Sequence, residues 1–296
     1  MMRFGAVLLA LSLSLPAPAA AQDFWTHWGD GRGELNGYRT VQPRYETPRS
    51  GTQVLVFVTE EMSERLRVKV EDRSQARDAF PVMKLNAIED FQTGVYDYNV
   101  MTSTFCRVAP GWPVAKVSFS SQDWCGHVYH QLLPRSGRIV GDYHSYFEGE
   151  ADGTEELPLP EDGVLEDALP ILLRGWQGEY LEAGESRTVP LLPRLFRSRL
   201  RHRPLAWERA RITRSPTTSQ IQVPAGPFRV WTWRVEVEGG ATTTYEIEAD
   251  SPYRLVRRAG SSGDRAELLG SSRLAYWELN RPGGEAYLRQ LGLRAP

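Results

Sequence analysis

The sequence is poor in the residues that reactive and metal-binding sites most often use. Only two cysteines and five histidines occur in 296 residues, and lysine occurs only at Lys69, Lys84 and Lys116. The formal net charge is −2 at pH 7, so the chain has no basic excess with which to bind nucleic acid. No apolar run reaches the roughly 20 residues that a helix needs to span a bilayer, so we expect no membrane-spanning segment.

The N-terminus has the layout of a secretory signal peptide. Arg3 is followed by an apolar run over 4–15 and then by small residues that end at Ala21. We expect cleavage after residues 1–21, and therefore a periplasmic or secreted protein, with a Gram-negative periplasm as the simplest location. No repeat, low-complexity tract or linker divides the remaining chain, which predicts a single β-rich domain over 22–296.

Apolar alternation over most of the chain predicts a mainly β protein. The stretches QVLVFVTE (53–60) and RLRVKVED (65–72) are typical of half-buried strands, and short turns between strands predict antiparallel neighbours. We expect a large curved antiparallel sheet or half-barrel of about 10–13 strands. It would consist of a meander over 34–150 and a second β half over 185–277.

The segment between the two β halves has a different pattern. Between Val164 and Leu173 the apolar residues recur at helical spacing, with Asp162 as the expected N-cap. This predicts a helix over about 161–176, kinked or interrupted at Pro170, around which the sheet would wrap. A short amphipathic helix over 284–292 is expected to close the chain.

Four stretches in the second half carry a resemblance to a known family; they are VLEDALPILLRGW (164–176), LEAGESRTVPLL (181–192), VPAGPFRVWTWRVEVEG (223–239) and SPYRLVRR (251–258). Their order resembles an uncharacterised family of secreted bacterial proteins, a domain of unknown function with a curved sheet around a helix. The wider group is similar in shape to the periplasmic lipoprotein carriers LolA and LolB, whose open half-barrels shelter acyl chains. The resemblance implies a carrier-like fold and brings no catalytic residue with it.

The two cysteines are Cys106 and Cys125. In an oxidising compartment two thiols most often pair, so we favour a disulfide between them. Such a bond would close a loop of about 20 residues and contribute roughly 3 kcal/mol. Free buried thiols, metal ligation and a reactive cysteine remain as alternatives.

The stretch 116–150 holds Cys125 and three of the five histidines. Alternation places Cys125, His127 and Tyr129 on one face of a strand. A hairpin turn at Ser136 and Gly137 would set His144 opposite Tyr129, but a register slip of one residue would move it to the other face.

This stretch suggests an enzyme as the alternative to a binding protein. A hydrolase or a thiol- or zinc-dependent enzyme would be centred on Cys125, His127 and His144, and a zinc site would add Asp123 or Asp142. The other interpretation is that the histidines only form hydrogen bonds beside a sheet. Because the ligand spacing matches no established zinc motif, we expect no metal and no cofactor.

Polar residues in one phase of three neighbouring strands form the second candidate site. Those with a possible role in ligand binding are Lys84, Asn86, Asp97, Asn99, Lys116 and Gln122. An antiparallel sheet normally has one solvated face, so this stripe is either ordinary surface or the concave side of a half-barrel. On a concave side the two lysines would present positive charge to an anionic headgroup.

These observations predict a non-enzymatic binding protein. We expect it to bind an apolar or amphipathic ligand, such as a lipid, or a cell-envelope protein. Trp231 and Trp233 share one face of a strand and would belong to the core or line an apolar cavity.

Overall fold

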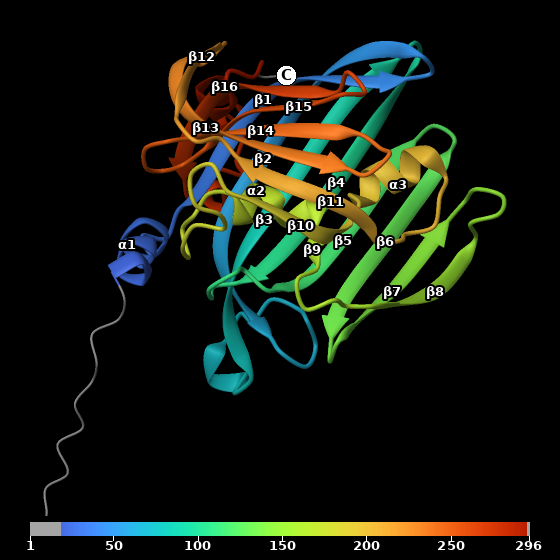
Figure 1. The fold of residues 1–296 in the computed structure, drawn as a ribbon, viewed down its shortest axis with the longest axis horizontal. Helices are drawn as coiled ribbons and strands as arrows, with labels where there is room; N and C mark the ends of the chain where they lie inside the picture. The colour runs from blue at the N-terminus through green and yellow to red at the C-terminus, as the bar shows by residue number, and fades with distance from the viewer. Residues whose placement is uncertain (1–18, 295–296) are drawn as a thin grey trace, which may run out of the picture.

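The computed structural model describes residues 19–294, so most of the predicted signal peptide lies outside the described residues. These residues form one sheet of 16 strands that bends over on itself without closing (Figure 1). The predicted fold class, a mainly antiparallel curved sheet, is confirmed, and the sheet has more strands than the sequence led us to expect. A 3₁₀ segment, η4 (Gly284–Leu291), stands where the C-terminal helix was predicted.

The first half is a meander in which each strand pairs antiparallel with the next. Its members are β1 (Gly33–Arg44), β2 (Thr47–Ser63), β3 (Ala79–Thr93), β4 (Tyr96–Arg107), β5 (Val114–Asp123), β6 (Gly126–Arg135), β7 (Arg138–Ser145) and β8 (Asp152–Pro158). Short hairpin turns join most of them, as at Ser136 and Gly137, which both have positive φ. β8 forms one edge of the sheet.

The second half returns to the first through a pairing between the first and last strands. Its members are β9 (Val164–Leu165), β10 (Ser186–Leu192), β11 (Glu208–Arg214), β12 (Ser219–Val223), β13 (Gly226–Val237), β14 (Thr242–Glu248), β15 (Leu255–Gly260) and β16 (Arg265–Leu274). β16 lies antiparallel to β1, so the two halves form one continuous sheet. β9, the other edge, is parallel to β10.

The inner faces of the two halves enclose one hydrophobic core. Leu85 and Phe91 of β3 belong to the same cluster as Trp233 of β13 and Tyr245 of β14, and Trp231 packs against that cluster. Figure 1 shows β10, β11 and β13–β16 lying across the first meander. Side chains fill most of the space between them, and a small space with mixed polar and apolar lining, next to Glu89 and Asp167, has a volume of about 50 Å³.

The predicted helix over 161–176 is much shorter in the structure. Only a 3₁₀ turn, η2 (Glu166–Ala168), and one α-helical turn, α2 (Leu169–Leu172), form there. Val164 and Leu165 are extended and pair with β10. From Val164 onward the segment is inserted into the core, so the apolar spacing reflects burial on several sides rather than one helical face.

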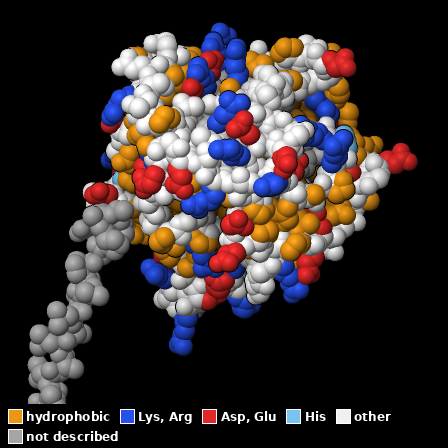
Figure 2. All heavy atoms as spheres, in the orientation of Figure 1, with side chains coloured by type: hydrophobic (Ala, Val, Ile, Leu, Met, Phe, Trp, Pro, Cys, Tyr) orange, Lys and Arg blue, Asp and Glu red, His pale blue; other side chains and the backbone are white. Residues whose placement is uncertain are grey.

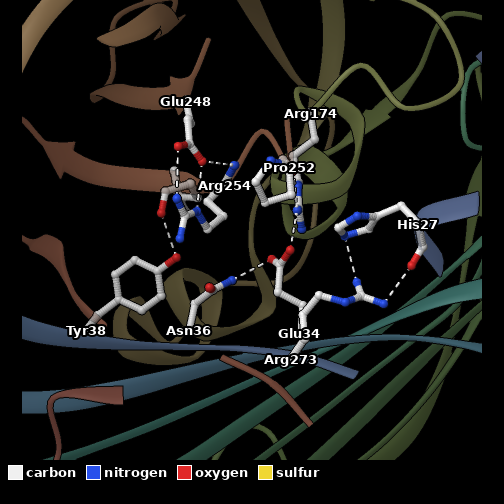
Figure 3. Close-up of polar contacts among 10 residues, drawn as sticks. His27, Glu34, Asn36, Tyr38, Arg174, Glu248, Pro252, Arg254 and Arg273 are labelled. Carbon is white, nitrogen blue, oxygen red and sulfur yellow. Dashed lines mark hydrogen bonds and ion pairs between the residues drawn. The ribbon is translucent and has the colours of Figure 1, made fainter. Parts of the chain in front are cut away.

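Two helices and two 3₁₀ turns complete the fold; they are α1 (Ala19–Trp28), α3 (Leu195–Arg201), η1 (Arg73–Gln75) and η3 (Tyr276–Glu278). α3 packs against β4 and β5 on the inner face of the sheet. α1 is fixed to the sheet by Arg273, which donates hydrogen bonds to Nε2 and to the carbonyl oxygen of His27, both over 2.6 Å (Figure 3). Burial lowers the pKa of His27, and the positive charge of Arg273 lowers it further. The lowered pKa favours the neutral imidazole, which can accept this hydrogen bond.

A buried ion pair lies beside this attachment. Nη2 of Arg174 is 2.8 Å from Oε2 of Glu34, and each side chain is only 1% exposed. Arg174 also donates to the carbonyl oxygen of Pro252 over 2.7 Å, while Asn36 donates to Glu34 over 2.7 Å (Figure 3). The contacts join β1, the segment after α2 and the loop before β15 in one polar network within the core.

Candidate functional site

The predicted disulfide between Cys106 and Cys125 is wrong, and both cysteines are free thiols. Cys106 lies at one end of the β4–β5 pair, opposite Val114, whereas Cys125 follows the other end of β5 in the turn to β6. A strand of this length separates the two by about 30 Å. A disulfide requires Cα atoms within about 7 Å, so the antiparallel topology itself prevents the bond.

We predict that a thiol-alkylating reagent modifies one cysteine in the folded protein and two after unfolding. Cys125 is exposed, whereas Cys106 is fully buried and burial raises the pKa of its thiol. Mass spectrometry before and after denaturation would count the labels, with Cys125→Ser as the control that leaves no reactive thiol in the folded state. Two labels, or none, on the folded wild-type chain would contradict this arrangement.

The structure does not assemble the predicted catalytic group into a reactive centre. The charge of Asp123 raises the pKa of the Cys125 thiol, which disfavours the thiolate that a nucleophile requires. The register predicted from a turn at Ser136 and Gly137 is observed, with His144 opposite Tyr129. His127 and His144 are therefore diagonal neighbours, and the described residues contain no group of three or more potential ligands able to hold a metal ion.

The six predicted ligand-binding residues lie on the face of the sheet that points away from the core. On β3, Leu85 and Phe91 point inward, so Lys84 and Asn86 point outward; cross-strand pairing carries this face to Asp97, Asn99, Lys116 and Gln122. Asn86 accepts a hydrogen bond from Ser103 over 2.7 Å, and Asn99 donates to Asp97 over 3.0 Å.

The two lysines of this face are already engaged within the protein. Lys84 forms an ion pair with Glu60, and both side chains are mostly buried. Lys116 donates a hydrogen bond to the carbonyl oxygen of Arg67 over 3.3 Å, and burial lowers the pKa of its ammonium group. Neither lysine is a free cation ready to bind an anionic headgroup.

Four of the predicted site residues nevertheless meet in one open groove across β3–β8. Asn99, Gln122, His127 and His144 all line it, together with Asp90, Met101, Ser120, Tyr129, Tyr146 and Asp152. We call this feature the outer groove; its volume is about 620 Å³. It brings together residues that the sequence assigned to two separate candidate sites.

A smaller and deeper hollow lies on the opposite side of the same strands, between their inner face and α3. This α3 cavity has a volume of about 180 Å³. Its apolar part is formed by four buried side chains, which are Phe119, Val128, Leu195 and Leu205. They come from two strands, from α3 and from the loop that follows it, so the cavity exists only because α3 folds onto the sheet.

The rest of the cavity is lined by paired polar groups. Nε2 of His130 lies 2.6 Å from Oε1 of Glu155. Glu150 accepts a hydrogen bond from Oγ of Ser145, and its other carboxylate oxygen lies 2.5 Å from Nδ1 of His202. Burial opposes ionisation of Glu150, but these hydrogen bonds prevail and lower its pKa.

Arg199 is a buried polar group of the cavity whose bonding is incomplete. Its side chain is 7% exposed, and its guanidinium carbon lies 3.9 Å from the centre of the Phe147 ring. Nη1 contacts the imidazole of His202 at 3.2 Å, while Nε is buried and has no hydrogen-bond partner among residues 19–294. Burial lowers the pKa of this arginine, because nearby Glu150, 3.8 Å away, compensates the charge only in part.

Sequence reasoning missed the α3 cavity because the residues that form it are separated in the chain. No candidate site predicted from the sequence included His130, and α3, a helix of seven residues, was not predicted. The available signal was the phase of β6, in which His130 lies on the same face as the buried Val128 and Leu132. That phase places an imidazole on the core side, where a polar group needs a partner.

Comparison of the chain with protein-family models gives no match, and no curated protein matches it. No helix in residues 19–294 is both long and apolar enough to cross a membrane. On the face that Figure 2 shows, acidic and basic side chains are interspersed, with hydrophobic side chains visible between them. Neither sign of charge dominates this face, in keeping with the small net charge of the sequence.

Proposed function

We propose that the protein is a non-enzymatic binder of a small amphipathic ligand in the periplasm or outside the cell. The observation that carries this proposal is the α3 cavity, which has a buried apolar part and a polar part that contains Arg199. Sites for small molecules typically combine an apolar lining with a few convergent polar groups. The signal-peptide pattern over 1–21 supports the location.

The size of the cavity limits the ligand. Ligand pockets for drug-sized molecules usually measure about 300–1,000 Å³, whereas an apolar cavity of about 150 Å³ can bind benzene. At about 180 Å³, the α3 cavity has room for one ring, for a short acyl chain or for the end of a longer one. A ligand of this size would be smaller than the acyl group of a lipoprotein.

The polar part of the cavity indicates which end group the ligand carries. The unpartnered Nε–H of Arg199 would donate a hydrogen bond to an acceptor oxygen of the ligand, and a carboxylate would also compensate the charge of the arginine. Glu150 and Glu155 already accept bonds from histidine, so they are not free to bind a cation without losing those contacts. We therefore infer a small monocarboxylic acid, aliphatic or aromatic.

We predict that hexanoate or benzoate raises the melting temperature of the purified chain and that Ser198→Leu removes this increase. Ser198 lies on α3 and lines the cavity, so a leucine side chain there would occupy the ligand's volume. A ligand present at 100 times its dissociation constant stabilises a protein by about 2.7 kcal/mol. The measurement is thermal unfolding with and without each acid.

The matched control is Ser219→Leu, which makes the same change on the exposed strand β12 and should preserve the increase. Hexan-1-ol, which lacks the carboxylate, should give a smaller increase than hexanoate. The proposal fails if Ser198→Leu responds to the acids as fully as the wild-type chain does. It also fails if no acid raises the melting temperature and mass spectrometry finds no small molecule in the purified protein.

A further inference from the structure

We propose that the outer groove is a second binding site, specific for a neutral glycan. The groove lies on the face of β3–β8 opposite the α3 cavity, so this proposal does not depend on the function inferred for that cavity. The order of the side chains across the sheet, their exposure and their charge all favour such a ligand.

Cross-strand pairing arranges the groove residues in two parallel rows. The first row crosses four strands and consists of Asp90, Asn99, Gln122 and His127. The second crosses six strands and consists of Ile88, Met101, Ser120, Tyr129, His144 and Asp152. With strands about 4.8 Å apart, the longer row extends over about 24 Å, which suits an extended, chain-like ligand.

The first row offers hydrogen-bonding groups of both kinds. Asn99 and Gln122 each carry an amide with donors and an acceptor, while Asp90 accepts. Gln122 and His127 are exposed, and within the described residues their side chains make no hydrogen bond to protein. Hydroxyl groups both donate and accept, so a polyhydroxylated ligand would satisfy such a row along its whole length.

The second row and its surroundings provide apolar contact area. Tyr129 is 40% exposed and Met101 36%, and Tyr146 at the end of the groove is 73% exposed. Tyrosine is amphipathic, with an apolar ring and a polar tip, so the ring of Tyr129 can cover the C–H face of a sugar while its hydroxyl donates to Oε1 of Gln131 over 3.2 Å. A row of polar groups beside exposed rings complements a molecule with hydroxyl edges and apolar faces.

Charge and backbone geometry argue against the other classes of extended ligand. None of the described residues that line the groove is lysine or arginine, and Asp90 and Asp152 would repel a nucleic acid or another polyanion. A peptide that adds to a sheet needs an unpaired strand edge. The groove instead crosses the faces of β3–β7, whose backbone groups are paired on both sides, and it meets the open edge of the sheet only at Asp152 of β8, so most of its length offers a peptide no such edge.

The test is binding of the purified chain to neutral glycans, measured by affinity electrophoresis and by isothermal titration. The probes are laminarin, cellopentaose and chitopentaose, with heparin as the polyanion. We expect binding to at least one neutral glycan and none to heparin. The double variant Gln122→Ala/Tyr129→Ala should bind that glycan about tenfold more weakly or worse, equivalent to at least about 1.4 kcal/mol.

The matched control is Gln220→Ala/Tyr287→Ala, which removes the same two residue types elsewhere, and Tyr287 is also 40% exposed. It should bind as the wild-type chain does, and so should Ser198→Leu, because the α3 cavity is a separate site. The proposal is overturned if no neutral glycan binds, if heparin binds instead, or if the control variant loses affinity as strongly as the groove variant. Loss of glycan binding in Ser198→Leu would also overturn it.

Discussion

Replacing Arg174 by methionine is expected to lower the free energy of unfolding by about 3–5 kcal/mol, the usual cost of removing one partner of a buried ion pair. Within the part of the chain that the structure describes, the carboxylate of Glu34 would remain in the core with Asn36 as its one remaining side-chain donor (Figure 3). The guanidinium also lies 4.4 Å from the ring centre of Phe57 and donates to Pro252. Urea-induced unfolding, followed by circular dichroism, would measure the loss.

Two further variants separate the charge from the packing. Glu34→Gln combined with Arg174→Met removes both charges and keeps an acceptor for Asn36, so it should recover a large part of the lost stability. Arg39→Met breaks the ion pair with Glu267, in which Arg39 is 55% exposed, and should cost less than about 1 kcal/mol. If Arg174→Met itself lowers the free energy of unfolding by less than about 1 kcal/mol, the buried ion pair is not needed for stability.

Changing Asp167 to asparagine is expected to stabilise the protein at neutral pH and to leave it unchanged in acid. Burial raises the pKa of Asp167 from 3.8 to about 6, against the opposing effect of Arg194. Between these two pH values the folded state binds more protons than the unfolded state, so stability falls as the pH rises through this window. Above pH 6 the ionised side chain destabilises the fold by about 2 kcal/mol. This free energy is smaller than the whole pKa shift would give, because Asp167 is partly exposed and solvent screens its charge.

The measurement is the free energy of unfolding of both chains at pH 4, 5, 6 and 7. The difference in the free energy of unfolding between Asp167→Asn and the wild-type chain should increase from near zero at pH 4 and reach its full value near pH 7. Asparagine keeps an oxygen that can accept the hydrogen bond from the backbone N–H of Leu195, which Asp167 accepts over 3.0 Å. Asp162→Asn, at an exposed site, should show no such increase, and a pH-independent effect of Asp167→Asn would refute the interpretation.

The sequence predicts the meander well because alternation and turn chemistry are local. The turn at Ser136 and Gly137 fixes the pairing of His144 with Tyr129, since a two-residue hairpin with positive φ at both positions has only one register. The helix over 161–176 was not predictable in the same way. A short segment that is buried all round has the same apolar spacing whether it is helical or extended, and contacts with both halves decide its form.

The buried charges show a second limit of sequence reasoning. Glu89 lies in phase with Leu85 and Phe91 on β3, so alternation alone places it in the core, where burial raises its pKa. What alternation does not give is its surroundings. Gln53 of β2 donates to it over 3.2 Å, and Arg194 and Arg258, whose charges favour its ionised form, lie more than a hundred residues away in the chain.

The two candidate sites also differ in how far local sequence pattern predicts them. The outer groove could be anticipated in part, because Asn99, Gln122, His127 and His144 belong to consecutive strands whose pairing follows from the meander. The α3 cavity could not, because Arg199 reaches it only after the chain has crossed from β8 through the core segment and β10. Long-range folding, rather than local pattern, creates that site.

The pairing of β1 with β16 has a consequence for how the chain acquires its structure. The two strands lie side by side in the middle of the sheet, although more than 220 residues separate them. During synthesis the N-terminal part of the chain is made first, so β1 can pair with β2 early. The other edge of β1 stays open until the residues of β16 have been synthesised. Such distant contacts slow folding, and an open edge favours intermolecular pairing. Until β16 is in place, the open edge of β1 is therefore a site at which two chains can pair with each other.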